Sequence, residues 1–344
     1  MWIHLSQRLL SLLQLTRMAL VFTAVADGWC TLLLAAQQRA AVRGTTLAAQ
    51  LDARQFLAAA AVSVGLYGFG MSLNDIIDRR RDQQISPGRP LPSGRLGLAA
   101  AHVVCGLLVA GAIAAGAVYG RITHDFVCLV LVIWTGMLIA FYDLAGKYLV
   151  ALGLLSLGLI RFFHALVFAP DVPLLWHPLW LLNHVAVLSA VAYWWEEKRP
   201  PLTRAHWALV LGGLEGVDAM LVALVAARRA VPDAGGAAGA LTALRVEPGL
   251  VLPVLATAAF VALAWRVRRR SATSREAGQK VMLYGLLWLI VYDAAFVAGY
   301  VRDAVATAAI LLLLPVAYLS VRLMRWWSQL MALSQRPSFK RART

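Results

Sequence analysis

The stretch "NDIIDRRRDQQISPGRPLPSGR", residues 74–95, places three acids and five arginines directly after an apolar run, residues 55–73. That run is long enough to cross a lipid bilayer as a helix. Charged groups are costly inside hydrocarbon, so charge of this density marks the point where a helix leaves the membrane. The stretch therefore predicts a membrane fold with a polar site at one end.

The composition agrees with a membrane protein. The chain has 344 residues, of which 61% are hydrophobic and 14% charged, and its mean hydropathy is +0.71. Soluble domains are about 45–50% apolar and about 25% charged. The net charge of +15 does not indicate a nucleic-acid partner, because the basic residues fall between apolar segments. There they act as topology signals and contact anionic membrane lipid.

Ten apolar runs approach the ~20 residues that a helix needs to cross a bilayer. They lie at residues 13–36, 55–73, 98–119, 125–142, 148–168, 174–195, 206–227, 249–266, 281–299 and 304–321. In a nine-span alternative, one of the last two runs is re-entrant. The sequence thus predicts an all-α polytopic membrane bundle of nine or ten transmembrane helices over residues 1–325. Residues 326–344 are predicted to form a basic cytoplasmic tail.

The distribution of Lys and Arg predicts the orientation. With the N-terminus inside, the inner connections hold 22 of these residues and the outer ones 8, and the inner side of a membrane protein carries the excess. Both termini and residues 74–95 are therefore expected in the cytoplasm, in a multi-pass protein of a bacterial-type inner membrane. The small-residue stretch 231–240 is expected outside. Arg17 and Asp27 interrupt the first apolar run, which argues against a cleaved signal peptide.

The acids of residues 74–95 follow a helical spacing. Asn74, Asp78 and Asp82 are four residues apart, so at ~100° per residue they fall on one face of a helix, with Asp75 on a neighbouring face. Hard oxygen ligands of this kind suit Mg²⁺, which binds through one or two carboxylates together with substrate phosphates. The three residues span ~12 Å along a helix, which is too far for one ion. A cluster of ions that bridges a diphosphate fits this length.

The arginines around these acids suggest the same ligand. Guanidinium groups match phosphate oxygens in a bidentate way. The following "SPGRPLPSGR" predicts a rigid loop that turns back, because each Pro removes a donor and Gly permits unusual dihedrals. In the alternative interpretation, the acids merely pair with the arginines of a topology signal. The ordered spacing followed by the Pro-Gly loop disfavours it.

The stretch resembles the first signature of the UbiA-type intramembrane prenyltransferases, N-D-x-x-D-x-x-x-D followed by R-P-L-P-x-G. Three further segments are similar to parts of that family, and together they extend the resemblance over about residues 10–200. They are "TRMALVFTAVADG" at 16–28, "FYDLAGKY" at 141–148 and "GLIRFFHALV" at 158–167.

The resemblance implies a helical bundle around a central cavity, with Mg²⁺ and an isoprenyl diphosphate at its cytoplasmic end. Such an enzyme moves the prenyl group to a hydrophobic or aromatic acceptor. Carried onto this chain, the resemblance implies Asn74, Asp78 and Asp82 as metal ligands, and catalytic roles for Asp75, Lys147 and Arg161. It implies diphosphate contacts by Arg17, Arg89, Lys147 and Arg161.

The sequence departs from the family at its second Asp-rich motif. Residues 192–204, "AYWWEEKRPPLTR", offer only Glu196 and Glu197, which are adjacent and therefore point about 100° apart on a helix. Three alternatives stay open: one of the two glutamates supplies a metal ligand, the second metal site is altered, or catalysis is lost. Asp143, or Glu215 and Asp218, could compensate.

These alternatives correspond to different functions. With catalysis retained, the chain is a prenyltransferase or an intramembrane terpene cyclase. With catalysis lost, it is a membrane scaffold or a carrier of a lipid or a small aromatic compound. An acid brought close to Asp78 would favour the enzyme.

Polar residues inside the predicted spans are functional hypotheses, because they are costly in a membrane. Asp27 is expected to meet a partner from another helix, and Asp293 to pair with a basic residue. His164 and His184 are interpreted as structural histidines. The three cysteines, Cys30, Cys105 and Cys128, show no metal-ligand spacing and are interpreted as small buried hydrophobic residues.

Overall fold

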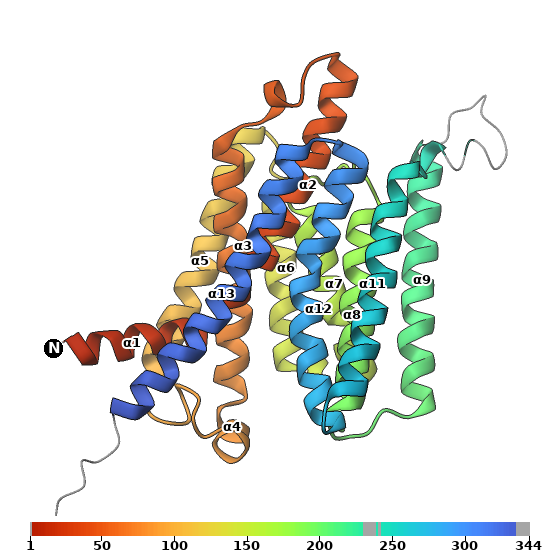
Figure 1. Cartoon of the computed structure of the whole chain (residues 1–344). Coiled ribbons are helices and arrows are strands. Elements are labelled where there is room, and N and C mark those ends of the chain that lie inside the picture. The colour runs from red at the N-terminus through yellow and green to blue at the C-terminus, as the bar shows by residue number, and fades with distance from the viewer. Residues whose placement is uncertain (1, 230–238, 240–241, 335–344) are drawn as a thin grey trace, which may run out of the picture.

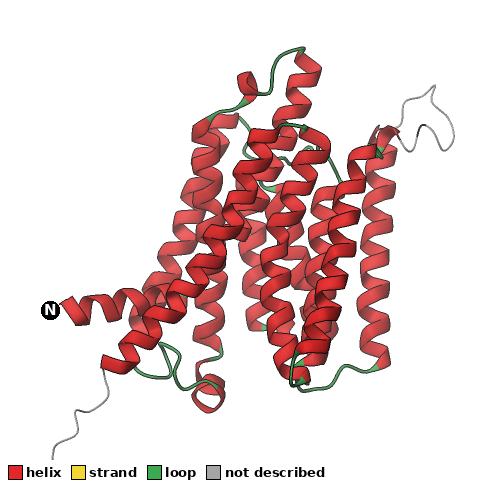
Figure 2. Ribbon diagram, in the orientation of Figure 1, coloured by secondary structure: helices red, strands yellow, loops and turns green. Residues whose placement is uncertain are grey.

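The structure, a computed structural model, describes residues 2–229, 239 and 242–334. This part of the chain consists of helices and their connecting loops and contains no strand (Figure 2). The predicted all-α bundle is therefore confirmed. Residues 335–344 of the predicted tail, and all of 231–240 except residue 239, lie outside the described residues, so those predictions are not addressed.

The main helices, in chain order, are α1 (Trp2–Leu15), α2 (Val21–Arg43), α3 (Ala53–Ile77), α4 (Arg79–Ile85), α5 (Leu98–Thr123), α6 (Val127–Leu144), α7 (Val150–Leu166), α8 (Trp176–Trp195), α9 (Arg204–Arg229), α11 (Val251–Arg270), α12 (Ser274–Phe296) and α13 (Ala304–Ser334). Short 3-10 helices lie at Met18–Leu20, Ala48–Gln50, Gly146–Tyr148 and Pro248–Leu250, and a π-helix at Val297–Val301.

A helix stands at each of the ten predicted spans. Among the described residues, eight helical segments are long and apolar enough to cross a membrane, and the shorter apolar helix α7 and the 20-residue α8 complete the set. Both of the last two runs form full-length segments, Ser274–Val301 and Ala304–Leu330, so neither is re-entrant. Helix α13 continues to Ser334, past the predicted start of the tail at residue 326.

The first predicted span, 13–36, has the wrong boundaries. The helix breaks at Arg17, whose backbone is left-handed with φ 46°. Before the break, α1 lies across the end of the bundle, where it contacts α3 and α13 (Figure 1). After it, the membrane-length segment runs from Met18 to Arg43. The apolar pattern continues through the break, so hydropathy alone could not locate it.

The helices differ in how deeply they lie in the bundle. Among the membrane-length segments, those built on α2 and α12 are the most buried, whereas α5, α9, α11 and α13 turn large apolar side chains outward. Outward-facing Leu and Val suit a lipid surface, and helices satisfy their own backbone groups there. Polar side chains on α2 and α12 are therefore held inside the protein.

Small residues allow α3, which carries residues 74–77, and α7 to pack closely against neighbouring helices. A Cβ on Gly65 of α3 would lie 2.7 Å from the carbonyl oxygen of Leu108 on α5. On α7, a Cβ on Gly158 would lie 2.5 Å from the carbonyl oxygen of Leu182 on α8. Such close backbone approach is typical of membrane helix pairs with small interface residues. It fixes α3 and α7 within the bundle.

The segments predicted to be cytoplasmic gather at one end of the molecule. Helix α4 and the turn between α11 and α12 lie at the lower end in Figure 1, and α1 lies at the lower left. Which side of a membrane this end faces stays a prediction, as does the central cavity.

Candidate active site

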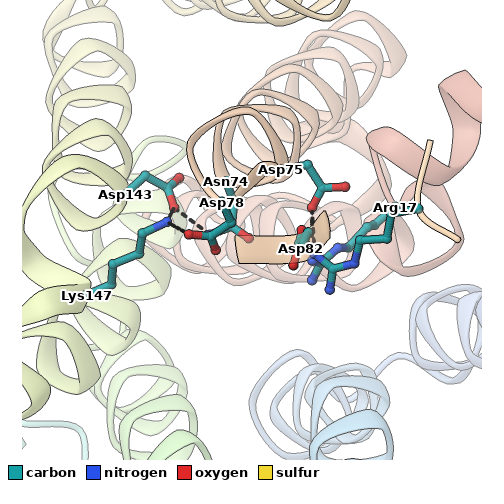
Figure 3. A network of polar contacts seen from close by, with 8 residues as sticks. Arg17, Asn74, Asp75, Asp78, Asp82, Asp143 and Lys147 are labelled. Atoms are coloured by element: carbon teal, nitrogen blue, oxygen red, sulfur yellow. Dashed lines mark hydrogen bonds and ion pairs between the residues drawn. The ribbon is translucent and has the colours of Figure 1, made fainter. Parts of the chain in front are cut away.

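Two polar groups lie side by side at this end of the bundle (Figure 3). We call them the Lys147 group and the Arg89 group, and together the end site. The Lys147 group consists of Asn74, Asp78, Asp143 and Lys147. The Arg89 group consists of Arg17, Asp75, Asp82 and Arg89.

The division arises where α3 ends. Asp78 sits between α3 and α4 with φ −79° and ψ 0°. Its N–H donates to the carbonyl of Asn74 at 2.9 Å, and the N–H of Asp82 donates to the carbonyl of Asp78 at 2.8 Å. The chain thus keeps a helical hydrogen-bond spacing but changes course at Asp78. The prediction that Asn74, Asp78 and Asp82 share one face is wrong, because Asp82 joins Asp75 instead.

In the Lys147 group, one ammonium lies between two carboxylates. Lys147 Nζ is 2.9 Å from Asp78 Oδ1 and 3.6 Å from Asp143 Oδ1. The amide of Asn74 donates to Asp143 Oδ1 at 2.8 Å and to Asp78 Oδ2 at 3.3 Å. The Asp143 side chain is 2% exposed and that of Asp78 is 19% exposed. Hard oxygens from α3 and α6 therefore converge around a position that already holds a cation.

In the Arg89 group, the Pro-Gly loop folds back onto the acids, as predicted. Arg89 Nη1 is 2.5 Å from Asp82 Oδ2 and 3.4 Å from Asp75 Oδ1. Arg17 Nη2 reaches Asp75 Oδ1 at 3.2 Å. The loop is anchored by apolar contacts in a small cluster that joins it to α1 and α5 and contains Leu15, Leu91, Leu96 and Ala101.

The charges of the end site suit an additional cation. Four carboxylates face three cationic side chains, so the site has a surplus of negative charge. The oxygens are carboxylate and amide oxygens, which are the ligands that Mg²⁺ prefers. The donor set thus fits a small divalent cation, and the Lys147 ammonium marks where a positive charge is stabilised.

The two glutamates predicted as metal ligands do not join this site. Glu196 follows directly after α8 and pairs with Lys198 at 3.2 Å. Within the described residues, neither Glu196 nor Glu197 contacts either group. Asp143 lies beside Asp78 instead. Its sequence signal was its position four residues before Lys147, with which it pairs at 3.6 Å although α6 ends between them at Leu144.

The other acids weighed as compensating ligands also lie elsewhere. Asp218 on α9 accepts a hydrogen bond from Asn183 on α8 at 2.7 Å. Glu215 interacts with Asp218 rather than with Asp78. Of the five acids weighed, Asp143 is thus the one that belongs to the Lys147 group in the described structure.

Arg161, predicted to contact diphosphate, is bound inside the bundle. Its Nη1 donates to Asp27 Oδ2 at 2.5 Å and its Nη2 donates to the hydroxyl of Thr23 at 2.9 Å. The Arg161 side chain is 11% exposed and that of Asp27 is fully buried. The structure therefore does not bring Arg161 to the end site. The expectation that Asp27 meets a partner from another helix is confirmed.

The histidines inside the bundle form local hydrogen bonds. Ring nitrogens of His164 and His184 lie 3.0 Å from the hydroxyl of Ser63 and the carbonyl of Gly285, in keeping with structural roles. Asp293 pairs with a basic residue, as expected, since its Oδ1 lies 2.8 Å from His177 Nε2. The sequence analysis did not single out His177, because a lone histidine at the start of an apolar helix has no spacing signal.

Among known proteins, solved structures are similar to this chain. No family model matches the sequence, and no curated protein is significantly similar to it. A solved structure of digeranylgeranylglyceryl phosphate synthase in membranes is similar, with a TM-score of 0.57 and 16% identity over 86% of this chain and 99% of that one.

A UbiA homolog from Aeropyrum pernix K1, solved in its apo form, is similar as well. Its TM-score is 0.51, with 16% identity over 82% of this chain and 97% of that one. At this identity the similarity establishes the fold. The chain therefore has the fold of the UbiA-type prenyltransferase structures, as the motif at residues 74–95 predicted.

Proposed function

We propose that the chain is a UbiA-type intramembrane prenyltransferase. It moves a prenyl group from an isoprenyl diphosphate to a hydrophobic or aromatic acceptor, with Mg²⁺ as cofactor. The observation that carries the proposal is the convergence of Asn74, Asp78 and Asp143 around the Lys147 ammonium. A bundle without this chemistry has no need to hold two carboxylates against one cation at the mouth of its helices.

The Lys147 group provides the metal ligands in this proposal. Asp78 and Asp143 supply carboxylate oxygens, and Asn74 supplies its amide oxygen after the side chain turns. Asp75 and Asp82 are available for further cations once Arg89 engages a phosphate. When bound, Mg²⁺ neutralises the charge that develops on the departing diphosphate.

The basic residues bind the diphosphate. Lys147, Arg17 and Arg89 are paired with carboxylates at distances of 2.5–3.6 Å, and the side chains of Arg17 and Arg89 are 40% and 35% exposed. Phosphate oxygens can replace carboxylate oxygens as partners of the two arginines at small cost, because Mg²⁺ takes their place beside the carboxylates. Arginine forks hold a diphosphate in a fixed orientation, and Lys147 stabilises the leaving group as a point charge.

The reaction follows from this arrangement. The bond between the allylic carbon and the diphosphate oxygen breaks, and the electron pair leaves with the diphosphate. A carbon or oxygen of the acceptor forms the new bond and then loses a proton. The apolar helices above the end site exclude water from the cationic prenyl group, which would otherwise be hydrolysed.

The alternative of a catalytically inactive scaffold or carrier is less well supported. That alternative gained its weight from the altered second motif at Glu196 and Glu197. Asp143 supplies an acid beside Asp78, so the loss of that motif does not remove the carboxylates that a metal needs. The excess of Lys and Arg at this end supports a location of the site at the cytoplasmic face.

Binding of a fluorescent geranylgeranyl diphosphate to the purified full chain tests the proposal. Wild type is compared with Asp78→Asn, in Mg²⁺ and in EDTA. Glu276→Gln is the matched control, since Glu276 pairs with Lys280 on α12 and is outside the end site. We expect binding that requires Mg²⁺ and is lost in Asp78→Asn alone. Binding that is absent, or indifferent to both metal and substitution, would favour the scaffold or carrier.

A further inference from the structure

A second cluster of metal-ligating side chains lies inside the bundle, away from the end site. Cys30 on α2, His177 on α8 and Asp293 on α12 each offer one ligand atom, and these atoms lie within 4.8 Å of one another. Each of the three residues is at most 1% exposed. Three helices far apart in the sequence therefore bring a thiol, an imidazole and a carboxylate to one point in the protein interior.

The surroundings of His177 accommodate the tautomer that a metal ligand needs. The hydroxyl of Thr31 lies 3.4 Å from His177 Nδ1 and 3.0 Å from the carbonyl oxygen of Asp27. A carbonyl only accepts, so Thr31 donates its single hydrogen to Asp27 and can accept from His177. With the proton on Nδ1, His177 donates to Thr31 and keeps a lone pair on Nε2.

That lone pair faces another acceptor. Nε2 is 2.8 Å from Asp293 Oδ1, and an ionised carboxylate has no hydrogen to donate. The second oxygen of the same side chain, Asp293 Oδ2, is buried without a hydrogen-bond partner. A buried acceptor without a partner is destabilising. The cluster thus presents converging lone pairs that lack a positive centre.

A proton on Nε2 would meet only part of this need. As the other neutral tautomer or as an imidazolium, His177 donates to Asp293 Oδ1 at 2.8 Å, but Oδ2 still lacks a partner. The thiol of Cys30 would contribute only its weak contact to the backbone carbonyl of Asp293, at 3.5 Å. A metal ion contacts all three groups at once and accounts for their convergence.

The donor set selects the ion. A thiolate, an imidazole nitrogen and a carboxylate together are typical of Zn²⁺, which binds them at about 2.0–2.3 Å. A metal-bound histidine usually donates its other N–H to a fixed acceptor, which here is Thr31. The charges also balance, because Zn²⁺ neutralises the Cys30 thiolate and the Asp293 carboxylate, while Arg161 neutralises the neighbouring Asp27.

We propose that Cys30, His177 and Asp293 form a zinc site that links α2, α8 and α12 in the interior of the bundle. The site has three protein ligands and one further coordination position. It is separate from the end site and takes no part in diphosphate binding.

Metal analysis of the full chain tests this site. Protein purified without an affinity tag and dialysed against a weak chelator is analysed for zinc by mass spectrometry. It is then reloaded with Co²⁺, whose sulfur-to-metal charge-transfer bands in the near ultraviolet report a thiolate ligand. Cys30→Ser is compared with Cys105→Ser and Cys128→Ser, which replace the other two buried cysteines.

We expect about one zinc per chain in wild type and in the Cys105→Ser and Cys128→Ser controls, and the charge-transfer bands in all three. Cys30→Ser should lose the bands and most of the zinc. Asp293→Asn should lose zinc but keep its fold, which circular dichroism checks. Wild-type protein that retains no zinc and binds Co²⁺ without thiolate bands would overturn the proposal, leaving a histidine–aspartate pair.

Discussion

The end site and the bundle interior use the same kinds of side chain in opposite ways. In the end site, Arg17 and Arg89 are 40% and 35% exposed and share the carboxylate of Asp75. In the interior, Arg161 and Asp27 form a pair that is 11% and 0% exposed. Water and ligands can replace an exposed partner, so exposed pairs contribute little stability. A buried charge has no replacement partner.

This difference separates the residues that bind ligand from those that stabilise the bundle. In our proposal, Arg17 and Arg89 can leave their carboxylates for phosphate oxygens, because bound Mg²⁺ then compensates the buried Asp75 and Asp82. The Asp27–Arg161 pair links α2 to α7 and cannot open without leaving a charge in an apolar medium. Substitutions in the two regions should therefore affect different quantities, ligand affinity at the end site and stability in the interior.

The largest effect is expected from Arg161→Met. Asp27 would keep a buried charge without a partner, and its Oδ1 already has no hydrogen-bond partner. Breaking such a pair typically lowers the free energy of unfolding by about 3–5 kcal/mol. Unfolding of the purified protein in mixed detergent micelles measures it.

The double variant Asp27→Leu with Arg161→Met is the control for this prediction. Because it removes both charges, it should recover most of the stability that Arg161→Met loses. If the double variant loses as much free energy of unfolding as Asp27→Leu and Arg161→Met lose in sum, the two residues do not act as a buried pair.

The next effect concerns the metal ligands of the end site. Asp143→Asn removes one of the carboxylates beside Asp78, and we expect the Mg²⁺ dependence of diphosphate binding to shift by at least about 10–100-fold. The double variant Glu196→Gln with Glu197→Gln should leave it unchanged. A titration of Mg²⁺ at fixed diphosphate measures both. If the double variant shifted the Mg²⁺ dependence and Asp143→Asn did not, the metal ligands would be the glutamates.

The sequence predicted the parts of the molecule that depend on local pattern. Apolar runs located the ten helices that stand at the predicted spans, and the charged stretch at residues 74–95 located the end site. It could not predict the break at Arg17 or the change of course at Asp78, because both occur within continuous helical patterns. Such breaks are set by tertiary partners, here Asp75 for Arg17 and Lys147 for Asp78.

The sequence also could not predict contacts between helices that are far apart along the chain. Asp143 lies 69 residues from Asn74, and Cys30 lies 263 residues from Asp293. Spacing rules apply within one element, so the metal role went to Glu196 and Glu197 from the resemblance to the second motif, and the cysteines were assigned to packing. Only the order in which α2, α8 and α12 pack brings the latter cluster together.

Lys147→Met is expected to have a smaller effect, which strengthens Mg²⁺ binding and weakens diphosphate binding. The ammonium competes with Mg²⁺ for Asp78 and Asp143, so its removal should tighten Mg²⁺ binding in the absence of diphosphate. A unit charge about 4 Å away contributes on the order of 1 kcal/mol where water screens it, so the gain is roughly fivefold. Diphosphate affinity should fall by a similar factor, since Lys147 also binds phosphate in our proposal.

Lys147→Arg separates charge from other effects of this substitution. It keeps the positive charge and should leave Mg²⁺ affinity near that of wild type. Isothermal titration with Mg²⁺ alone, followed by diphosphate binding, measures the two quantities. Weaker Mg²⁺ binding in Lys147→Met would show that Lys147 supports the metal site instead of competing with it.

The smallest effect is expected from Arg17→Met, and it tests the comparison of the two regions most directly. Arg17 pairs with Asp75 as Arg161 pairs with Asp27, but it is 40% exposed and Asp75 keeps Arg89 as a second partner. We expect a loss of at most about 1 kcal/mol in the free energy of unfolding. That loss should vanish in 1 M salt, where screening acts over about 3 Å. The Arg161→Met loss should persist there, because salt does not reach a buried pair. If Arg17→Met instead lowered the free energy of unfolding as much as Arg161→Met, at both salt concentrations, exposure would not distinguish the two regions. The cations of the end site would then be structural, and diphosphate could not displace their carboxylates at small cost.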